Sequence, residues 1–483
     1  MPFPDARPPD RQDTTDTEMT FDSLPNELVS IIFTHMYEML GEEEGFRKLF
    51  VEPGMDEDCD RDVTWKDENA VDPGYLFPKA IAAVCQRWRE IVERLPILWT
   101  RIVAFVDSSP TPLSEVEAYL KLSRDLPLQV YVLTRPDHDL EEDWGERTRC
   151  RDVIELLVPH IPRCQKIAFD VMYSSSLPSI SKDFLGCAPL LQMLNLKCET
   201  DDGVASGGQD PRSEIAEEPF LTPALKDLCV DGRNFVHASL ALPSWIESIP
   251  KGQIRLRVHN FAASDSISED LEFNLHDFIL VLERLKVVRL SLSNVKFSDH
   301  STVVPNASVS ADTLELERLN YHTFTGIMAF IADGGIESIR ISQCGIAFLG
   351  RDLHSDCLIL EGISAGADIS DFLVCWSGGE LKVSNCPGFD DIALETLGNM
   401  DNARIRSLII EDCQNISLEG VMEMAQRLNE WVALQRRDGC LDREKCALNN
   451  LSILGHPHVL TPAEELWFRQ NASSGEFVWT ARK

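Results

Sequence analysis

Short segments of alternating apolar and polar residues recur along most of the chain beyond residue 100. Each places two apolar side chains two positions apart, the spacing of side chains on one face of a β-strand. We therefore expect a series of short strands with longer connections between them. The pairs are Leu128/Val130, Ile167/Phe169, Leu194/Leu196, Leu228/Val230, Ile254/Leu256, Leu290/Leu292, Leu314/Leu316, Ile339/Ile341, Leu358/Leu360, Leu381/Val383 and Leu408/Ile410.

Between these pairs lie stretches in which apolar residues recur at three- and four-residue steps, the spacing of an amphipathic helix. One strand with one helix cannot bury its apolar face alone, whereas a stack of such units can. The pattern therefore favours a repeat array over an ordinary α/β domain, which would also alternate strands and helices. The expected helical stretches are Ser114–Leu126, Arg149–His160, Leu275–Leu285, Phe324–Ile331, Ile369–Trp376 and Leu418–Leu434.

The later repeats resemble leucine-rich repeats, which are 20 to 29 residues long. Two segments match the fuller pattern best: Ile336-x-x-Ile339-x-Ile341-x-x-Cys344 and Ile405-x-x-Leu408-x-Ile410-x-x-Cys413. A cysteine suits the position where the chain turns away from the strand, because a small side chain is needed there. We expect an α/β repeat, a leucine-rich-repeat-like strand-helix solenoid, over about residues 102–435.

In the N-terminal part the apolar residues have a different spacing, which predicts helices. Ser23 and Pro25 suit a helix start, and Leu28, Ile31, Ile32, His35 and Met36 then fall on one stripe. A second amphipathic helix is expected from Pro78, ending at Pro96, with Ile97-Leu98-Trp99 as an apolar clip. Its apolar stripe is Ile81, Val84, Cys85, Trp88, Ile91, Val92 and Leu95.

Three regions lie outside these patterns. Residues 1–20 are polar and contain prolines, which is typical of a disordered tail. An acidic stretch over about 38–77 is expected to be a solvated insertion in the helical module at 21–101. Residues 436–483, with Trp467, Phe468 and Trp479, are expected to cap the open end of the array, or alternatively to form a substrate-binding flap.

Composition narrows the possible partners. The 483 residues include 45 basic and 79 acidic side chains, a formal net charge of −34, which disfavours nucleic acid and anionic membranes as partners. The 14 cysteines follow no disulfide framework, and several lie in apolar runs, which indicates a reducing compartment, cytoplasm or nucleus. No apolar run approaches 18 residues and the N-terminus lacks a secretory apolar segment, so neither a spanning helix nor a signal peptide is expected.

Two candidate chemistries can be weighed from the residues. Gly362-Ile363-Ser364-Ala365-Gly366 matches a nucleophile elbow, and His456 or His458 would then supply the base. However, an oxyanion segment is missing upstream, and small residues are expected at any strand-to-helix turn. Cys440, Cys446, His456 and His458 carry zinc-binding atoms but lack the usual ligand spacing. We therefore expect no catalytic group, no metal and no cofactor.

The N-terminal elements resemble the F-box. The motif blocks appear in order as Leu24-Pro25-Asn26-Glu27-Leu28 continuing to Ile32-Phe33, then Val84-Cys85-x-x-Trp88, then Leu98-Trp99. Tyr119-Leu120-x-x-Ser123-x-x-x-Pro127-Leu128 is also similar to expanded fungal F-box families. The chain departs from the family in its acidic insertion, where the family has a short helical connection.

The resemblance implies a substrate receptor of a Skp–cullin–F-box ubiquitin ligase. In that family the F-box docks on the Skp adaptor of a cullin–RING ligase, and the repeats hold a protein substrate. By this resemblance Leu24, Pro25, Leu28, Ile32 and Phe33 would line the adaptor contact. The matches to the later blocks are Val84, Cys85, Trp88, Leu98 and Trp99, which would contact the adaptor or the core of the module.

The same residues allow other interpretations. The helices could simply cap the solenoid, in which case the chain would be a repeat scaffold with no ligase link. Arg255 and Arg257, with Arg289 and Arg340 on other strands, could form a basic pocket for a phosphorylated substrate or could be solvated surface charges.

Overall fold

The computed structural model describes residues 24–41, 77–135, 145–202, 219–262, 274–297, 308–331, 335–346, 348–399, 405–437, 448–471 and 476–482. The chain forms two compact units. Unit 1 comprises Met1–Thr100, Ala118–Leu126 and Arg135–Asp137, and unit 2 comprises the remainder. The predicted tail at 1–20 and most of the predicted acidic insertion lie outside the described residues.

Unit 1 is helical where it is described. It contains α1 (Asn26–Gly41), α3 (Lys79–Ala82), α4 (Gln86–Glu93), the 3-10 helix η3 (Pro96–Trp99) and the end of α5 (Leu113–Leu122). The single helix predicted from Pro78 is therefore two shorter helices. The division occurs because Cys85 has an extended backbone and caps α4, its Sγ accepting a hydrogen bond from the backbone N–H of Trp88 at 3.5 Å.

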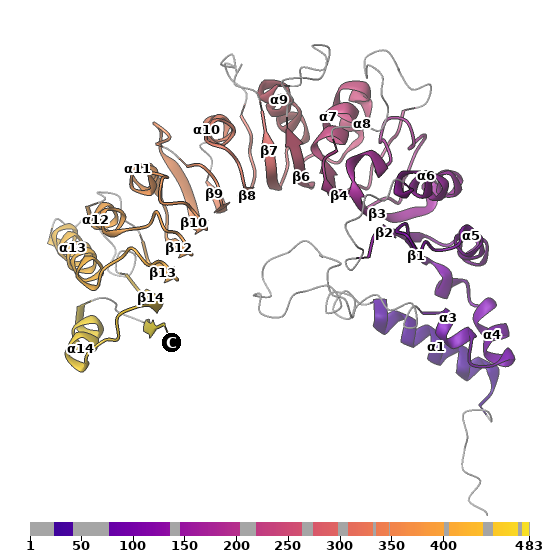
Figure 1. The fold of residues 1–483 in the computed structure, drawn as a ribbon, viewed down its shortest axis with the longest axis horizontal. Coiled ribbons are helices and arrows are strands. Elements are labelled where there is room, and N and C mark those ends of the chain that lie inside the picture. Colours follow the sequence, from indigo (N-terminus) through magenta and orange to yellow (C-terminus); the bar gives the residue numbers. More distant parts are fainter. Residues whose placement is uncertain are drawn as a thin grey trace, which may run out of the picture. The chain divides into compact units, whose positions relative to one another are not determined.

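Unit 2 contains one fifteen-stranded sheet in the part of the chain that the structure describes, and its strands pair in parallel (Figure 1). The strands follow one another in chain order, with the short β11 pairing only with β10. They are β1 (Arg101–Phe105), β2 (Leu128–Leu133), β3 (Cys164–Tyr173), β4 (Met193–Thr200), β5 (Asp227–Asp231), β6 (Arg255–Ala262), β7 (Arg289–Lys296), β8 (Thr313–Glu317), β9 (Ile336–Ser342), β10 (Leu353–Glu361), β11 (Trp376–Ser377), β12 (Glu380–Ser384), β13 (Ser407–Glu411), β14 (Asn450–His456) and β15 (Glu476–Ala481).

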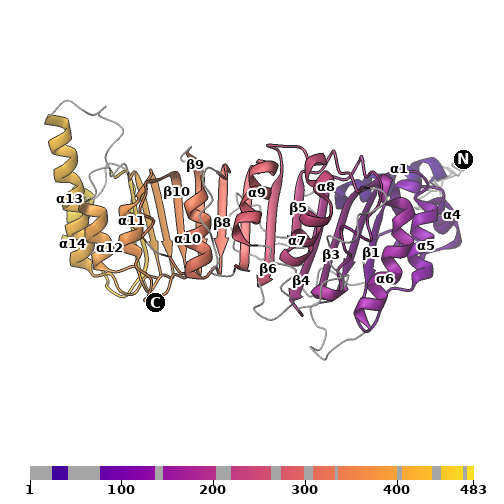
Figure 2. The ribbon, with the colours of Figure 1, turned by 90° about the horizontal axis from the view of Figure 1, so that it is seen from above.

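Helices connect most of these strands and lie along one face of the sheet (Figures 1 and 2). This follows from the order of the strands, because parallel crossovers of one hand that always advance in one direction place their helices on the same side. The helices are α6 (Glu146–Leu157), α7 (Gly232–Ala241), α8 (Pro243–Ser248), α9 (Leu275–Leu285), α10 (Tyr321–Phe330), α11 (Ile369–Val374), α12 (Asp391–Asn399), α13 (Leu418–Arg437) and α14 (Pro462–Asn471), with 3-10 turns η4 (Val158–Arg163) and η5 (Ser174–Ser176).

The predicted strand pairs form the core of unit 2. Ten of the eleven lie within β2 to β13. In the eleventh, Leu256 lies in β6 and Ile254 immediately precedes the first residue of that strand. Neighbouring pairs are in register, as in Leu290↔Leu314 and Leu292↔Leu316, so the apolar side chains form two continuous ladders that are almost completely buried. A doubly wound α/β domain would reverse its strand order, so the repeat-array prediction is confirmed.

Many of the strands end at or near a residue with a left-handed backbone conformation. Asn260, Asn294, Gln343, Asn385 and Asp412 all have φ near +50°, each at or near the end of its strand, where the chain turns toward the helix side. Backbone N–H groups of three of them donate to the carbonyl of the neighbouring strand, at 2.8 Å for Gln343 and Asn385 and 2.9 Å for Asp412. These bonds continue the parallel ladder through the turn.

The cysteine predicted at this turn packs as expected. The Sγ atoms of Cys344 and Cys386 donate to the carbonyls of Ser342 and Ser384, at 3.3 and 3.2 Å. Each also accepts a backbone N–H from the preceding repeat, at 3.4 Å. Burial raises the pKa of both thiols to about 11 and that of Cys413 to about 12, with nearby carboxylates adding to the rise and backbone hydrogen bonds opposing it.

The sheet extends beyond the predicted end of the array. β14 and β15 are its last two strands, in register with β13 through Leu408↔Leu451↔Phe477. The predicted boundary at 435 falls within α13. Much of the region expected to cap the array is therefore further repeat, and Phe468 of α14 packs on Phe477 with parallel rings 4.9 Å apart.

Candidate protein-docking site

Helix α1 is apolar on two faces. Val29, Phe33 and Tyr37 recur every fourth residue and are buried. The Tyr37 hydroxyl shares a hydrogen bond of 2.7 Å with the Thr100 hydroxyl. This face therefore packs on the other elements of unit 1, including α4 and η3.

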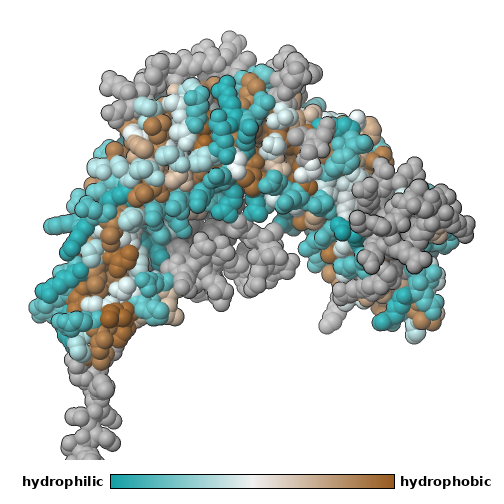
Figure 3. Space-filling model, turned by 180° about the vertical axis from the view of Figure 1, so that it is seen from behind, coloured by the Kyte–Doolittle hydropathy of each residue, from teal (hydrophilic) through white to brown (hydrophobic). Residues whose placement is uncertain are grey.

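The other apolar face of α1 points outward. Leu28 is 47% exposed, Ile31 63% and Met39 59%, and Met36 is also exposed. At 100° per residue these positions form one stripe along the helix, separated from the buried stripe by roughly a third of a turn. Apolar side chains accordingly gather at the surface of unit 1, at the lower left in Figure 3. We call Leu28, Ile31, Met36 and Met39 the α1 stripe.

Helix α4 and η3 hold α1 in place. Arg87 of α4 donates its Nε to Asn26 Oδ1 at 2.9 Å and its guanidinium also contacts the carbonyl of Leu24, so α4 is tied to the first turn of α1. Trp99 donates its indole N–H to the Val92 carbonyl at 2.9 Å. Trp99 also meets Tyr119 edge to face, with 5.0 Å between ring centroids. Burial is the main cause that raises the pKa of the Tyr119 hydroxyl far above its ordinary value.

The residues expected from the F-box resemblance divide into three groups by exposure. Pro25, Leu28, Val84 and Cys85 are exposed, and Leu24, Ile32 and Trp88 are partly buried. Phe33, Leu98 and Trp99 are buried and belong to the core of the module. The motif residues therefore do not form one contact surface, and only the first two groups are accessible to a partner.

Sequence reasoning did not single out Met39, and it did not distinguish the two faces of α1. The signal was present, because Val29, Phe33 and Tyr37 form a second apolar stripe beside the predicted one. A helix with one buried apolar stripe and one exposed apolar stripe is a candidate for docking a partner.

The sheet face opposite the helices, here called the open face, is polar. Its residues lie between the core ladder positions of each strand. On β7, β8, β9, β10, β12 and β13 serine and glutamate alternate in register: Ser293, Glu317, Ser342, Glu361, Ser384 and Glu411. Ser293 donates to Glu317 at 3.0 Å and Ser384 to Glu411 at 3.3 Å, so parts of this row are hydrogen-bonded internally.

The four arginines considered for a basic pocket do not come together. Arg255 and Arg289 are neighbours on β6 and β7, whereas Arg340 lies on β9. Arg255 pairs with Asp227 at 2.5 Å, and Arg340 pairs with Glu361 at 2.5 Å. Arg340 therefore lies apart from the others, and Arg255 and Arg340 are each neutralised by a carboxylate of the protein.

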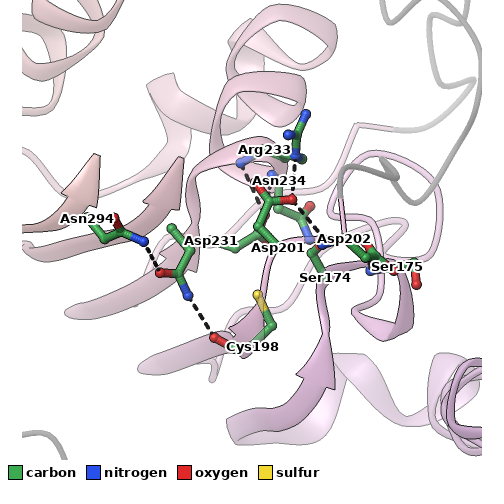
Figure 4. Close-up of polar contacts among 10 residues, drawn as sticks. Ser174, Ser175, Cys198, Asp201, Asp202, Asp231, Arg233, Asn234 and Asn294 are labelled. Carbon is green, nitrogen blue, oxygen red and sulfur yellow. Dashed lines mark hydrogen bonds and ion pairs between the residues drawn. The ribbon is translucent and has the colours of Figure 1, made fainter. Parts of the chain in front are cut away.

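A polar cluster that includes the buried Asp231 lies where β3 to β7 end (Figure 4). Asp231 caps α7, and one carboxylate oxygen accepts the N–H groups of Arg233 and Asn234, both at 3.1 Å. Arg233 in turn pairs with Asp201 at 2.7 Å. Burial is the main cause that raises the pKa of Asp231 to about 7, and the charge of Asp201 adds to it while the hydrogen bonds from α7 oppose it. The arrangement anchors α7.

The residues of the hydrolase alternative do not assemble into a catalytic group. Ser364 is exposed in the turn after β10. His456 lies at the end of β14, separated from β10 by two strands. Its Nε2 lies 3.1 Å from the Ile416 carbonyl and its Nδ1 accepts the His458 backbone N–H at 3.0 Å, so both ring nitrogens are engaged by backbone.

His458 also has a local structural role. Its Nε2 lies 3.2 Å from Glu464, and Glu464 and Thr461 exchange hydrogen bonds in a capping box at the start of α14. Cys440 and Cys446 lie outside the described residues. Within the ranges that are described, no group of three histidine, cysteine or acidic side chains could hold a metal ion.

Comparison with models of known protein families and with curated proteins gives no match for this chain. In the portion of the chain with described coordinates, no helix is both long enough and apolar enough to cross a membrane.

Proposed function

We propose that this protein is the substrate-recognition subunit of a Skp–cullin–F-box ubiquitin ligase. The helical module at the N-terminus docks the Skp adaptor, and the leucine-rich-repeat-like solenoid holds a protein substrate. The observation that carries the proposal is the α1 stripe, because four large apolar side chains on one helix face are left exposed while the other face is buried. A partner that covers them gains roughly 1.5–3 kcal/mol for each fully buried aliphatic side chain.

The motif order supports the same function. Leu24-Pro25 stands at the start of α1, Val84-Cys85 at the start of α4 and Leu98-Trp99 in η3, so each block of the F-box resemblance coincides with a boundary or turn of unit 1. The exposed Val84 adds a further apolar side chain to the surface of unit 1. Such a receptor needs no catalytic residue, because holding a substrate near a ubiquitin-charged enzyme raises its effective concentration.

Co-expression of the full chain with the Skp adaptor tests the proposal. We expect the adaptor to co-purify with the wild type and to be lost from the double variant Leu28→Ser/Ile31→Ser. Val459→Ser/Leu466→Ser is the matched control, because these side chains are also exposed but lie in unit 2. Failure of the wild type to capture the adaptor would favour a repeat scaffold without a ligase link.

The state of the cysteines bears on the cellular compartment of the protein. The eleven cysteines that the structure describes are all free thiols, and most are buried in the repeats. A reducing compartment, cytoplasm or nucleus, fits this usage and fits a ubiquitin ligase subunit.

A further inference from the structure

A pocket of about 470 Å³ lies on unit 2 beside α11, β11 and α12. Its lining includes the exposed side chains of Val374 and Ile392, which are 59% and 63% exposed. These two residues come from different helices, so the apolar surface exists only because the fold brings α11 and α12 together.

One part of the pocket lining is held by hydrogen bonds and strand pairing. Trp376 is almost fully buried and donates its indole N–H to the Ser355 hydroxyl at 2.9 Å. The strand β11 that carries Trp376 pairs with the start of β10 through Leu353↔Trp376 and His354↔Ser377. The His354 imidazole also contacts the Ser377 hydroxyl. A ligand would therefore meet a preformed wall, which lowers the entropy that binding costs.

The charge around the pocket is negative. Asp352 is an exposed lining residue, and Glu395 of α12 also lines the pocket. Arg427 bonds to Glu395 at 3.0 Å, but it also bonds to Glu423 at 2.6 Å, so one positive charge is shared between two carboxylates. The net charge of −34 for the whole chain adds attraction for cations.

We infer that this pocket binds an extended segment of a protein partner in which an aliphatic side chain stands next to a lysine or arginine. The aliphatic group packs on Val374 and Ile392, and the cation pairs with Asp352. The volume is in the range of peptide- and ligand-binding pockets. Identifying this partner as the ligase substrate rests on the proposed function, whereas the binding itself does not.

Fluorescence anisotropy with the full chain alone, without any adaptor, tests the inference. The probes are fluorescein-labelled peptides with Leu-Arg-Leu, Leu-Glu-Leu or Ser-Arg-Ser at the centre of a Gly-Ser flank. We expect the Leu-Arg-Leu peptide to bind most tightly. Ile392→Ser should weaken it about tenfold, the loss expected for one buried apolar contact, and Asp352→Asn about threefold, the loss expected for one exposed charge pair.

Matched variants on other parts of unit 2 control for indirect effects. Val459→Ser removes an equally exposed aliphatic residue, and Glu247→Gln removes an exposed carboxylate on α8. Both should leave binding unchanged. Asp352→Lys should reverse the preference toward Leu-Glu-Leu. Because all the substituted side chains are exposed, unchanged circular dichroism and melting of each variant should accompany these results.

Three results would overturn the inference: absence of Leu-Arg-Leu binding, equal binding of Leu-Arg-Leu and Leu-Glu-Leu, or binding that survives both Ile392→Ser and Asp352→Asn. A lower sedimentation coefficient for Ile392→Ser than for the wild type would instead identify a second copy of the chain as the occupant. Adaptor capture is a separate measurement, so failure of the pocket and failure of the proposed ligase role can be told apart.

Discussion

The rings of Phe33 and Trp88 meet edge to face, with 5.1 Å between their centroids and 69° between their planes. The contact joins α1 to α4 on the buried face of α1, which the Tyr37–Thr100 hydrogen bond also holds. Leu28 and Ile31, on the other face of the same helix, are exposed.

Phe33→Ala is therefore expected to destabilise unit 1 far more than Ile31→Ala. Removing a buried phenylalanine typically costs about 3–5 kcal/mol, whereas truncating an exposed side chain usually changes stability by less than about 0.5 kcal/mol. Amide hydrogen exchange of α1 in the two variants measures the difference. Equal effects of the two substitutions would show that α1 is rotated relative to the orientation described above.

Thiol reactivity should follow burial. Cys85 and Cys187 are exposed, whereas Cys344, Cys386 and Cys413 are buried in the repeat turns with pKa values raised to about 11, 11 and 12. Brief treatment of the native protein with iodoacetamide at pH 8, followed by mass spectrometry, should label the first two and leave the other three unmodified. Labelling of all five at similar rates would contradict the turn packing.

Asp231 predicts how stability changes with pH. Its folded pKa of about 7 lies above the ordinary value of 3.8, so the folded state holds a proton that the unfolded state releases. The stability that the protonated Asp231 carboxyl contributes to the fold is therefore fully present below about pH 4, and it is lost as the pH rises through about 7.

Asp231→Asn removes this titration, and an asparagine oxygen can still accept the N–H groups of Arg233 and Asn234. We expect the free energy of unfolding of the variant, relative to that of the wild type, to rise by on the order of 2–4 kcal/mol between pH 4 and pH 8. Denaturant unfolding at the two pH values measures it. Parallel pH profiles of the two proteins would mean that Asp231 is ionised in the fold at both.

An active-site serine probe addresses the remaining enzymatic alternative. Because both ring nitrogens of His456 are engaged by backbone, we expect a fluorophosphonate to leave Ser364 unlabelled in the native protein. Labelling at Ser364 that disappears on denaturation would require a base that the described contacts do not provide.

Most of the repeat architecture could be predicted from sequence because each strand carries its own two-residue signal. Leu381/Val383 and Leu408/Ile410 each identify a strand without reference to any other part of the chain. Helix α9 was predicted with both ends, since Asn274 caps it and the apolar period is regular.

Elements that break the repeat spacing were not predicted. Leu451 follows Leu408 by far more than one ordinary repeat because α13 is twenty residues long, so β14 fell in the region expected to be a cap. Helix α12 was not predicted, and its start depends on Asp390, which caps the N–H groups of Ile392 and Ala393.

The candidate site could be predicted only in part. The sequence identifies α1 as amphipathic, but both of its stripes are apolar, and the choice of buried face depends on how α4 and η3 pack against it. The pocket between α11 and α12 could not be predicted, because Val374 and Ile392 are brought together only by the stacking of two repeats.

Hydrogen–deuterium exchange of the full chain with and without the Skp adaptor tests the central claim most directly. The claim is that the outward apolar face of α1 is covered by a separate protein. We predict slower exchange across residues 26–41 on adding the adaptor, with exchange in β5 to β13 unchanged. Unchanged exchange in α1 at saturating adaptor, or protection confined to the sheet, would contradict it.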